Sequence, residues 1–135
     1  MRLFIDDERR APEGYTDLAV TTEMAIAMLE RARRENDPLE LVSFDYDAHS
    51  HLNWTFTSVA EWMRDNDFWP AEIRIHTYNS WIGRPWYEHF FTMHAPASTL
   101  VDTTDPWTFL VLNEYFKSDR PRPQWVTEFE KSLEH

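Results

Sequence analysis

The chain has 135 residues, no cysteine, 42% hydrophobic content and a formal net charge of -11 at pH 7. The absence of cysteine excludes disulfides and thiolate metal sites, so any metal must be held by carboxylates, carbonyls or histidine. The negative charge opposes diffuse binding to nucleic acid, because that affinity depends on Lys and Arg displacing counterions from phosphates. We therefore expect one globular domain, in which a nucleotide partner would need a local basic site.

The chain carries no sequence signal for a membrane or for secretion. No apolar run approaches the roughly 20 residues that a membrane-spanning helix needs, and no cationic segment precedes an apolar stretch near the start. We expect a soluble protein of the cytoplasm that binds neither membranes nor extended nucleic acid. Residues 133–135 resemble the start of an expression-tag scar, so the single predicted domain covers residues 1–132.

Short runs rich in β-forming residues predict four strands, at residues 3–5, 18–20, 41–44 and 73–76. A fifth strand is predicted for residues 98–101. After it, Asp105 and Pro106 have the order of a helix cap followed by proline. They predict a last helix whose apolar face comprises Trp107, Leu110, Val111 and Tyr115.

Stretches with helical periodicity follow the second, third and fourth strands. Thr22 is the predicted cap of a helix that residues 36–38 terminate. Ser58 and Glu61 have the spacing of a capping box and predict the start of a shorter helix. Proline loses no hydrogen bond at the first helical position, so the run Gly83-Arg84-Pro85 predicts the start of a third helix.

Strands that alternate with helices predict right-handed crossovers and a mostly parallel sheet. The fold class is therefore α/β, a single flavodoxin-like domain with strand order 2-1-3-4-5 and flanking helices. The first crossover is unusual because residues 6–16 contain Pro12 and Gly14 and show no helical period. We expect an irregular loop there, without a full helix.

Acidic residues follow the first and third predicted strands, and these strands flank the point where the strand order reverses. In such folds, ligands bind beyond the carboxyl ends of the strands near that point. Like charges repel unless they are neutralised, and Mg²⁺ or Mn²⁺ would be held by carboxylates in this way. The predicted metal ligands are Asp6, Asp7, Asp45 and Asp47. The alternative is a solvated loop whose acids cap helices.

The end of the fourth strand is polar and cationic. It reads His76, Thr77 and Asn79, and Gly83 and Arg84 follow at a predicted helix start. Free amides at a helix N-terminus favour an anion, and a guanidinium can bind phosphate with two hydrogen bonds. Together with a metal on the other side, these residues predict a phosphoryl site. The alternatives are a histidine that is hydrogen-bonded in the core and an arginine that is a surface cation.

Two further groups have weaker signals. His49 and His51 could extend the metal site, although histidines in a loop are commoner. Trp81, Trp86 and Tyr87 could stack on a base, but aromatic residues at helical spacing more often belong to the core.

Three of these acidic residues resemble the acidic site of the receiver domains of two-component response regulators. In those domains an acidic pair binds Mg²⁺ and a third-strand aspartate accepts a phosphoryl group, and Asp6, Asp7 and Asp45 match these positions. Thr77 matches the fourth-strand Thr or Ser of that family. The lysine expected at the end of the fifth strand is missing from residues 100–103.

A closer resemblance is to cyclic-phosphate processing receiver domains. Their pattern has Asp-Asp-x-Arg-x-x-Pro, then Asp-x-Asp, then His-Ser/Thr-x-Asn with Gly-Arg beyond it. The chain matches it, over roughly residues 1 to 94, at residues 6–12, 45–47, 76–79 and 83–84. Two positions depart from the pattern. Tyr46 stands where that family usually has histidine, and residues 48–56 lack the Leu-Gly that follows the second acid.

This resemblance implies a metal-binding domain that recognises or processes phosphates, such as cyclic phosphates of nucleotides or RNA ends. It implies that Mg²⁺ polarises a phosphoryl oxygen or activates water and that Arg9 and Arg84 stabilise charge. It also implies that His76 is a general acid or base. Phosphate contacts would come from Arg9, Thr77, Asn79, Gly83 and Arg84. Whether the domain is a phosphoesterase stays open.

Two alternatives stay open. The first is a phosphoacceptor signalling receiver in which Asp45 takes the phosphoryl group. The second is a noncatalytic interaction module in which the acids serve only structure and exposed aromatic residues bind another protein.

Overall fold

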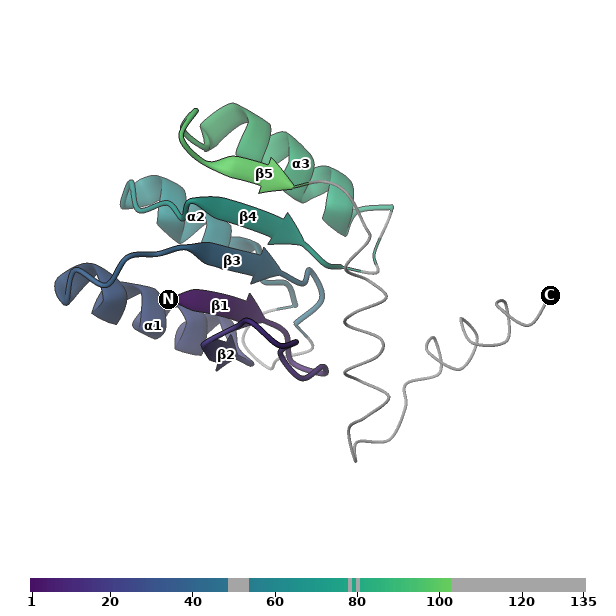
Figure 1. Ribbon diagram of the computed structural model, residues 1–135. Helices are drawn as coiled ribbons and strands as arrows, with labels where there is room; N and C mark the ends of the chain where they lie inside the picture. Colours follow the sequence, from purple (N-terminus) through teal and green to yellow (C-terminus); the bar gives the residue numbers. More distant parts are fainter. Residues whose placement is uncertain (49–53, 78, 80, 103–135) are drawn as a thin grey trace.

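The computed structural model describes residues 1–48, 54–77, 79 and 81–102. Its five strands are all parallel and lie in the order β2-β1-β3-β4-β5 (Figure 1), as the sequence predicts. Their bounds are β1 Arg2–Ile5, β2 Asp17–Ala19, β3 Leu41–Phe44, β4 Glu72–Ile75 and β5 Leu100–Asp102. The carboxyl ends of β1, β3 and β4 therefore lie along one edge of the sheet, which we call the carboxyl edge.

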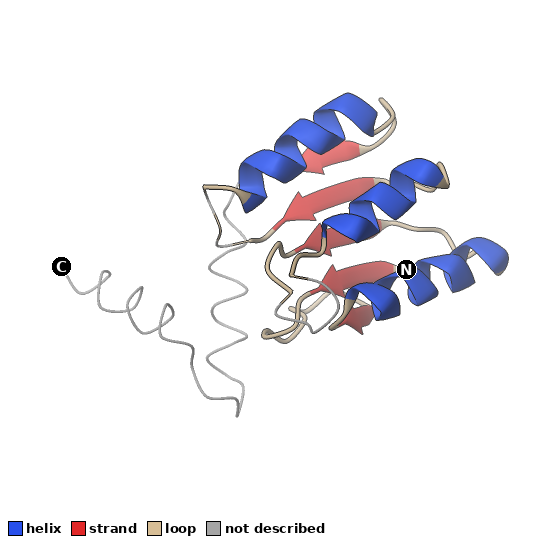
Figure 2. Ribbon diagram, turned by 180° about the vertical axis from the view of Figure 1, so that it is seen from behind, coloured by secondary structure: helices blue, strands red, loops and turns tan. Residues whose placement is uncertain are grey.

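Three helices, α1 (Thr22–Arg34), α2 (Thr57–Asp65) and α3 (Gly83–His94), cover one face of this sheet (Figure 2). The crossovers from β2 to β3, β3 to β4 and β4 to β5 all run in the same direction across the sheet. Right-handed connections that run in one direction place their helices on the same face. No helix of the described residues is long and apolar enough to cross a membrane.

The β1-to-β2 connection, residues 6–16, runs the other way and contains no helix, as predicted. Its side chains Ala11 and Tyr15, together with Leu18 of β2, pack on Phe4 on the opposite face of the sheet. This loop also carries the first acidic residues to the carboxyl edge.

Two predicted helix caps are corrected. The cap of α1 is Thr21 rather than Thr22, because the Thr21 side chain accepts the N–H of Met24. The capping box predicted from Ser58 is wrong, since α2 begins at Thr57 and its N-cap residue is Phe56. The N–H of Phe56 donates to a carbonyl in the segment after β3. This contact holds the chain where the helix begins, before Ser58.

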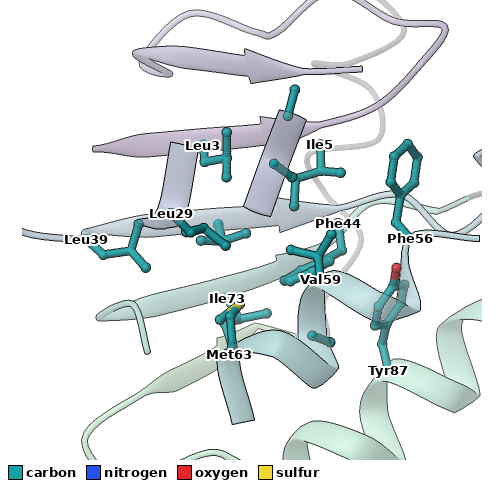
Figure 3. Packing of buried hydrophobic residues seen from close by; sticks show 14 of the residues in the cluster. Leu3, Ile5, Leu29, Leu39, Phe44, Phe56, Val59, Met63, Ile73 and Tyr87 are labelled. Carbon is teal, nitrogen blue, oxygen red and sulfur yellow. The ribbon is translucent and has the colours of Figure 1, made fainter. Parts of the chain in front are cut away.

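The core lies between the sheet and the three helices (Figure 3). Its buried side chains include Leu3, Ile5, Phe44 and Ile73 from the strands and Leu29, Val59, Met63 and Tyr87 from the helices. Fully burying one such side chain stabilises the fold by roughly 1.5–3 kcal/mol. This packing holds the strand ends that carry the polar residues.

Two contacts fix the start of α3 against the end of β3. The hydroxyl of Tyr87 donates to the Asp45 carbonyl oxygen at 2.6 Å. A Cβ atom on Gly83 would lie 2.6 Å from the Cβ and Cγ atoms of Tyr46, so only glycine allows this approach. The first turn of α3 is therefore held at the carboxyl edge.

Three predictions concern residues outside those that the structure describes. They are the last helix, the two loop histidines His49 and His51, and the domain boundary at residue 132. The single domain of residues 1–132 stays a prediction.

Candidate functional site

Three of the four predicted metal ligands come together at the carboxyl edge. Asp6 and Asp7 follow β1 and Asp45 follows β3, and one carboxylate oxygen from each lies within 4.8 Å of the others. We call these three residues the acidic cluster. Asp47 is not part of it, and its backbone forms an antiparallel bridge with Thr55.

Asp6 is the most constrained member of the acidic cluster. Its Oδ1 atom accepts the backbone N–H groups of Glu8 (2.8 Å) and Arg9 (2.9 Å). Its Oδ2 atom contacts Arg9 Nη1 at 2.7 Å and His76 Nε2 at 3.0 Å. A carboxylate has about four lone-pair positions, so these bonds use its acceptor capacity. Burial opposes ionisation, but the His76 hydrogen bond and the Arg9 charge outweigh it and lower the pKa of Asp6 to about 2.

Arg9 lies inside the acidic cluster as a cation supplied by the chain itself. Its Nη1 atom is 2.7 Å from Asp6 Oδ2 and 3.7 Å from Asp45 Oδ2, and the residue is buried. Burial works against the charged form, but the charges of Asp6 and Asp45 raise the pKa of Arg9. Sequence reasoning placed Arg9 on a phosphate and missed this pairing. Arg9 follows Asp6 by three residues in a loop without a helix. This spacing is the sequence signal that could have indicated the pairing.

His76 is enclosed by protein groups. Its Nε2 atom is 3.0 Å from Asp6, its Nδ1 atom is 2.6 Å from Ser43 Oγ, and its ring stacks on Phe4. Burial lowers the pKa of His76 to about 4, although the hydrogen bond and the charge of Asp6 favour protonation. A neutral imidazole has one donor and one acceptor, so the Nε2–H donates to Asp6 and Nδ1 accepts from Ser43. This geometry favours a positioning role over proton transfer to a ligand.

Ser43 is a member of this network that the sequence did not reveal. It is fully buried in β3, in the run Leu41–Phe44. A polar residue within an otherwise apolar buried strand must find a partner, because an unsatisfied buried hydroxyl is costly. That rule indicates a partner but not its identity.

Asp45 differs from Asp6 in its charge state. It is buried, and its Oδ1 atom accepts the N–H of Tyr46 at 2.8 Å. Burial and the negative charge of Asp6 raise the pKa of Asp45 well above its ordinary value, and Arg9 offsets this only in part. Asp45 therefore holds a proton more readily than an ordinary aspartate.

Arg84 lies near the end of β4, and its charge contributes to the lowered pKa of His76. Its Nη2 atom donates to the Ile75 carbonyl at 3.0 Å, and its Nη1 atom is 4.0 Å from Glu88 Oε1. The guanidinium is thus held at the carboxyl edge by the last residue of β4.

Asn79 and Thr77 shape the turn that leads into α3. The Asn79 N–H donates to Thr77 Oγ1 at 3.1 Å, and Asn79 Oδ1 accepts the N–H of Ile82 at 2.9 Å. The helix that follows has no side-chain cap bond at its N-cap Ile82 and no acid in its first turn. The dipole at this end of α3 therefore has no acidic side chain from the first turn beside it.

The comparisons with known proteins bear on the same segment. Residues 1–90 match the cyclic-phosphate processing receiver domain, which is two thirds of the chain. The chain belongs to this family. The match to the cyclic-phosphate processing receiver domain includes the acidic cluster, Arg9, His76 and Arg84. No curated protein and no solved structure matches the chain.

The likeness to receiver domains implies a divalent cation, and the acidic cluster fits one in part. Three carboxylates within 4.8 Å of one another are a suitable donor set for a hard cation. The oxygens of Asp6 already accept four hydrogen bonds, however, and Arg9 lies beside them. Asp7 and Asp45 would therefore bind the ion directly, while Asp6 holds Arg9 next to it.

Proposed function

We propose that this domain binds a phosphate-bearing ligand, in the first place a cyclic phosphate, at the carboxyl edge of its sheet. The observation that carries the proposal is that two guanidinium groups lie at the end of β4: Arg84 donates to the carbonyl of Ile75, and Arg9 shares the Oδ2 atom of Asp6 with His76. Two arginines that flank the end of β4, beside carboxylates that suit a metal, form a charge pattern that complements a phosphate. The family match supports a cyclic phosphate.

Mg²⁺ or Mn²⁺ would be held by Asp7 and Asp45 and would neutralise phosphate oxygens. The chain itself supplies the remaining contacts. Asp6, bound by His76, fixes the position of the Arg9 guanidinium through the 2.7 Å contact. His76 is neutral, and both of its ring nitrogens are hydrogen-bonded. We therefore infer that its role is to orient Asp6 and, through Asp6, Arg9.

Arg84 would contact the phosphate from the other side. A guanidinium has five N–H donors in a planar fork, so Arg84 can keep its bond to the Ile75 carbonyl while it donates to a phosphate. Its contact with Glu88 is long at 4.0 Å, and partly exposed pairs of this kind contribute little to stability. A phosphate would replace Glu88 at small cost.

Ring opening, if the bound phosphate is also hydrolysed, requires a proton for the leaving oxygen. Water would attack phosphorus, the ring P–O bond would break, and the leaving oxygen would take the proton. That proton would come from the attacking water, because a carboxylate that binds a cation, as Asp45 would, gives up its own proton. The phosphoacceptor role of Asp45 remains a separate prediction, whose sign would be covalent labelling by a small phosphodonor.

Thermal stabilisation of the full chain tests the proposal. A ligand that binds only the folded state raises the melting temperature, so cyclic nucleotides with Mg²⁺ should raise it for the wild type. Replacing a charged hydrogen-bond donor costs about 1.5–3 kcal/mol, so Arg84→Gln should weaken binding roughly tenfold or more. Arg34→Gln is the matched control, because Arg34 is an exposed arginine at the other end of the fold, in the last turn of α1. The absence of any ligand effect on the wild type would contradict the proposal.

A further inference from the structure

Five tryptophans lie in the described residues, and they fall into two groups. Three of them, Trp62, Trp69 and Trp86, are partly buried and pack against the core. The other two, Trp54 and Trp81, are 84% and 90% exposed. A solvent-exposed indole presents a large apolar surface to water, so this second group needs an explanation that core packing does not supply.

Both exposed tryptophans lie at the carboxyl edge, on the segments that follow β3 and β4. Trp54 belongs to the strand-like segment after β3, where its carbonyl accepts the N–H of Ala48 at 3.0 Å. Trp81 lies in the turn that Asn79 closes onto Ile82, directly before α3. These connections leave the sheet at the arrowheads of β3 and β4 (Figure 1). The acidic cluster lies at the same edge of the sheet.

The described residues also include exposed apolar side chains elsewhere, at Met24, Met93 and Leu100, but the two exposed tryptophans both lie at the carboxyl edge. Ile82, beside Trp81, is also 61% exposed. Single exposed apolar residues are normal on a protein surface, but several at one edge indicate a binding surface. This edge also carries the guanidinium groups of Arg9 and Arg84. A ligand that fits both features has an aromatic part joined to an anionic part.

We propose that Trp54 and Trp81 bind the base of a nucleotide whose cyclic phosphate occupies the site between Arg9 and Arg84. This inference rests on the proposed phosphate site and names the ligand class as a nucleotide rather than a phosphate without a base. Indole rings bind bases by stacking, which tolerates different bases because every base has an aromatic face. The net charge of -11 opposes the binding of a longer nucleic acid and favours a single nucleotide or a short nucleic-acid end as the ligand.

Binding calorimetry on the full chain with Mg²⁺ tests this inference with two probes. One probe is adenosine 2′,3′-cyclic phosphate, and the other is glycerol cyclic phosphate, which has the ring but no base. The variants are Trp54→Ala, Trp81→Ala and Trp81→Phe. Met93→Ala is the matched control, because Met93 is 63% exposed in the last turn of α3, at the opposite end of that helix from Trp81.

The wild type should bind the nucleotide more tightly than the base-free probe. Each alanine variant should lose about 5- to 150-fold in affinity for the nucleotide, and Trp81→Phe should keep part of it. The same variants should bind the base-free probe like the wild type, and Met93→Ala should change neither affinity. Equal affinity of the wild type for the two probes, or unchanged nucleotide binding by both alanine variants, would overturn this inference alone. If neither probe binds the wild type, the proposed phosphate site fails as well.

Discussion

The Nη1 atom of Arg9 lies 2.7 Å from the Oδ2 atom of Asp6, within a group of carboxylates whose charge would otherwise have to be balanced by an external cation or by protonation. The folded chain therefore carries part of its own charge compensation at the carboxyl edge. A divalent cation bound as proposed, by Asp7 and Asp45, would share Asp45 with Arg9, so removing one should change the binding of the other.

Substitution of Arg9 by methionine should therefore make stability depend more strongly on metal. Without metal, Arg9→Met should lower the free energy of unfolding by about 3–5 kcal/mol, because it leaves a buried carboxylate without its partner. Mg²⁺ should then restore a part of this loss. The measurement is the melting temperature as a function of Mg²⁺ for the wild type and the variant. Arg31→Met, at an exposed arginine 3.8 Å from Asp17, is the control. A variant that gains no more from Mg²⁺ than the wild type does would show that Arg9 and the metal are independent.

His76 should make the fold sensitive to mild acid. Burial depresses its pKa from 6.5 to about 4, so the unfolded state binds a proton first as the pH falls. The stability that the neutral ring contributes is present above pH 6.5 and is lost as the pH falls through about 4, and it amounts to about 3 kcal/mol.

Equilibrium unfolding by denaturant across that pH range checks this expectation. The free energy of unfolding of His76→Gln should change less between pH 6.5 and about 4 than that of the wild type. His89→Gln, at an exposed histidine on α3, should keep the wild-type dependence. A His76→Gln profile as steep as that of the wild type would contradict the assignment of a buried neutral imidazole.

Asp45→Asn should stabilise the protein in the absence of metal. A folded-state pKa that is raised contributes stability at low pH that is lost as the pH rises through it, so the ionised carboxylate is unfavourable in the fold. The gain from asparagine should therefore grow with pH, and a gain of 1 kcal/mol would raise the melting temperature by about 2–5 °C. Thermal melts near pH 5 and near pH 8 provide the test. A variant that is less stable than the wild type at the higher pH would contradict it.

Gly83→Ala should destabilise the protein through Tyr46. The added methyl group would lie 2.6 Å from Tyr46 Cβ and Cγ, and overpacking of this kind typically costs 1–3 kcal/mol. Tyr46→Ala in the same chain should remove most of that cost, which a double-mutant cycle measures. Gly14→Ala is the comparison, because Gly14 has φ of +98° and no atoms within 4 Å of an added Cβ. Its cost is backbone strain and should not respond to Tyr46→Ala.

The parts of the site that could be predicted from sequence are those that follow from local patterns and strand order. Residues 3–5 and 41–44 have the apolar runs of buried strands, and a parallel sheet brings their carboxyl ends together. The convergence of Asp6 and Asp45 follows from those two facts. The helix starting at Gly83 was likewise predictable from the proline that follows two residues later.

The side-chain pairings could not be predicted because they join segments that are far apart in the chain. The bond between Ser43 and His76 crosses between strands 33 residues apart. The turn of Arg9 into the acidic cluster depends on the backbone path of a loop that has no periodicity. Asp47 is an acidic residue just after β3, as Asp45 is, but the structure does not bring it into the acidic cluster. Sequence therefore located the edge and its charged residues, whereas the network that orients them required the structure.

Phosphorus NMR of a 2′,3′-cyclic nucleotide titrated with the full chain and Mg²⁺ tests the central claim most directly, because the observed nucleus belongs to the group that the site is proposed to bind. The resonance should shift or broaden with the wild type and with Arg34→Gln, and much less with Arg84→Gln. Conversion to the resonance of an open phosphomonoester would add hydrolysis to binding. A resonance that the wild type leaves unchanged would contradict the account.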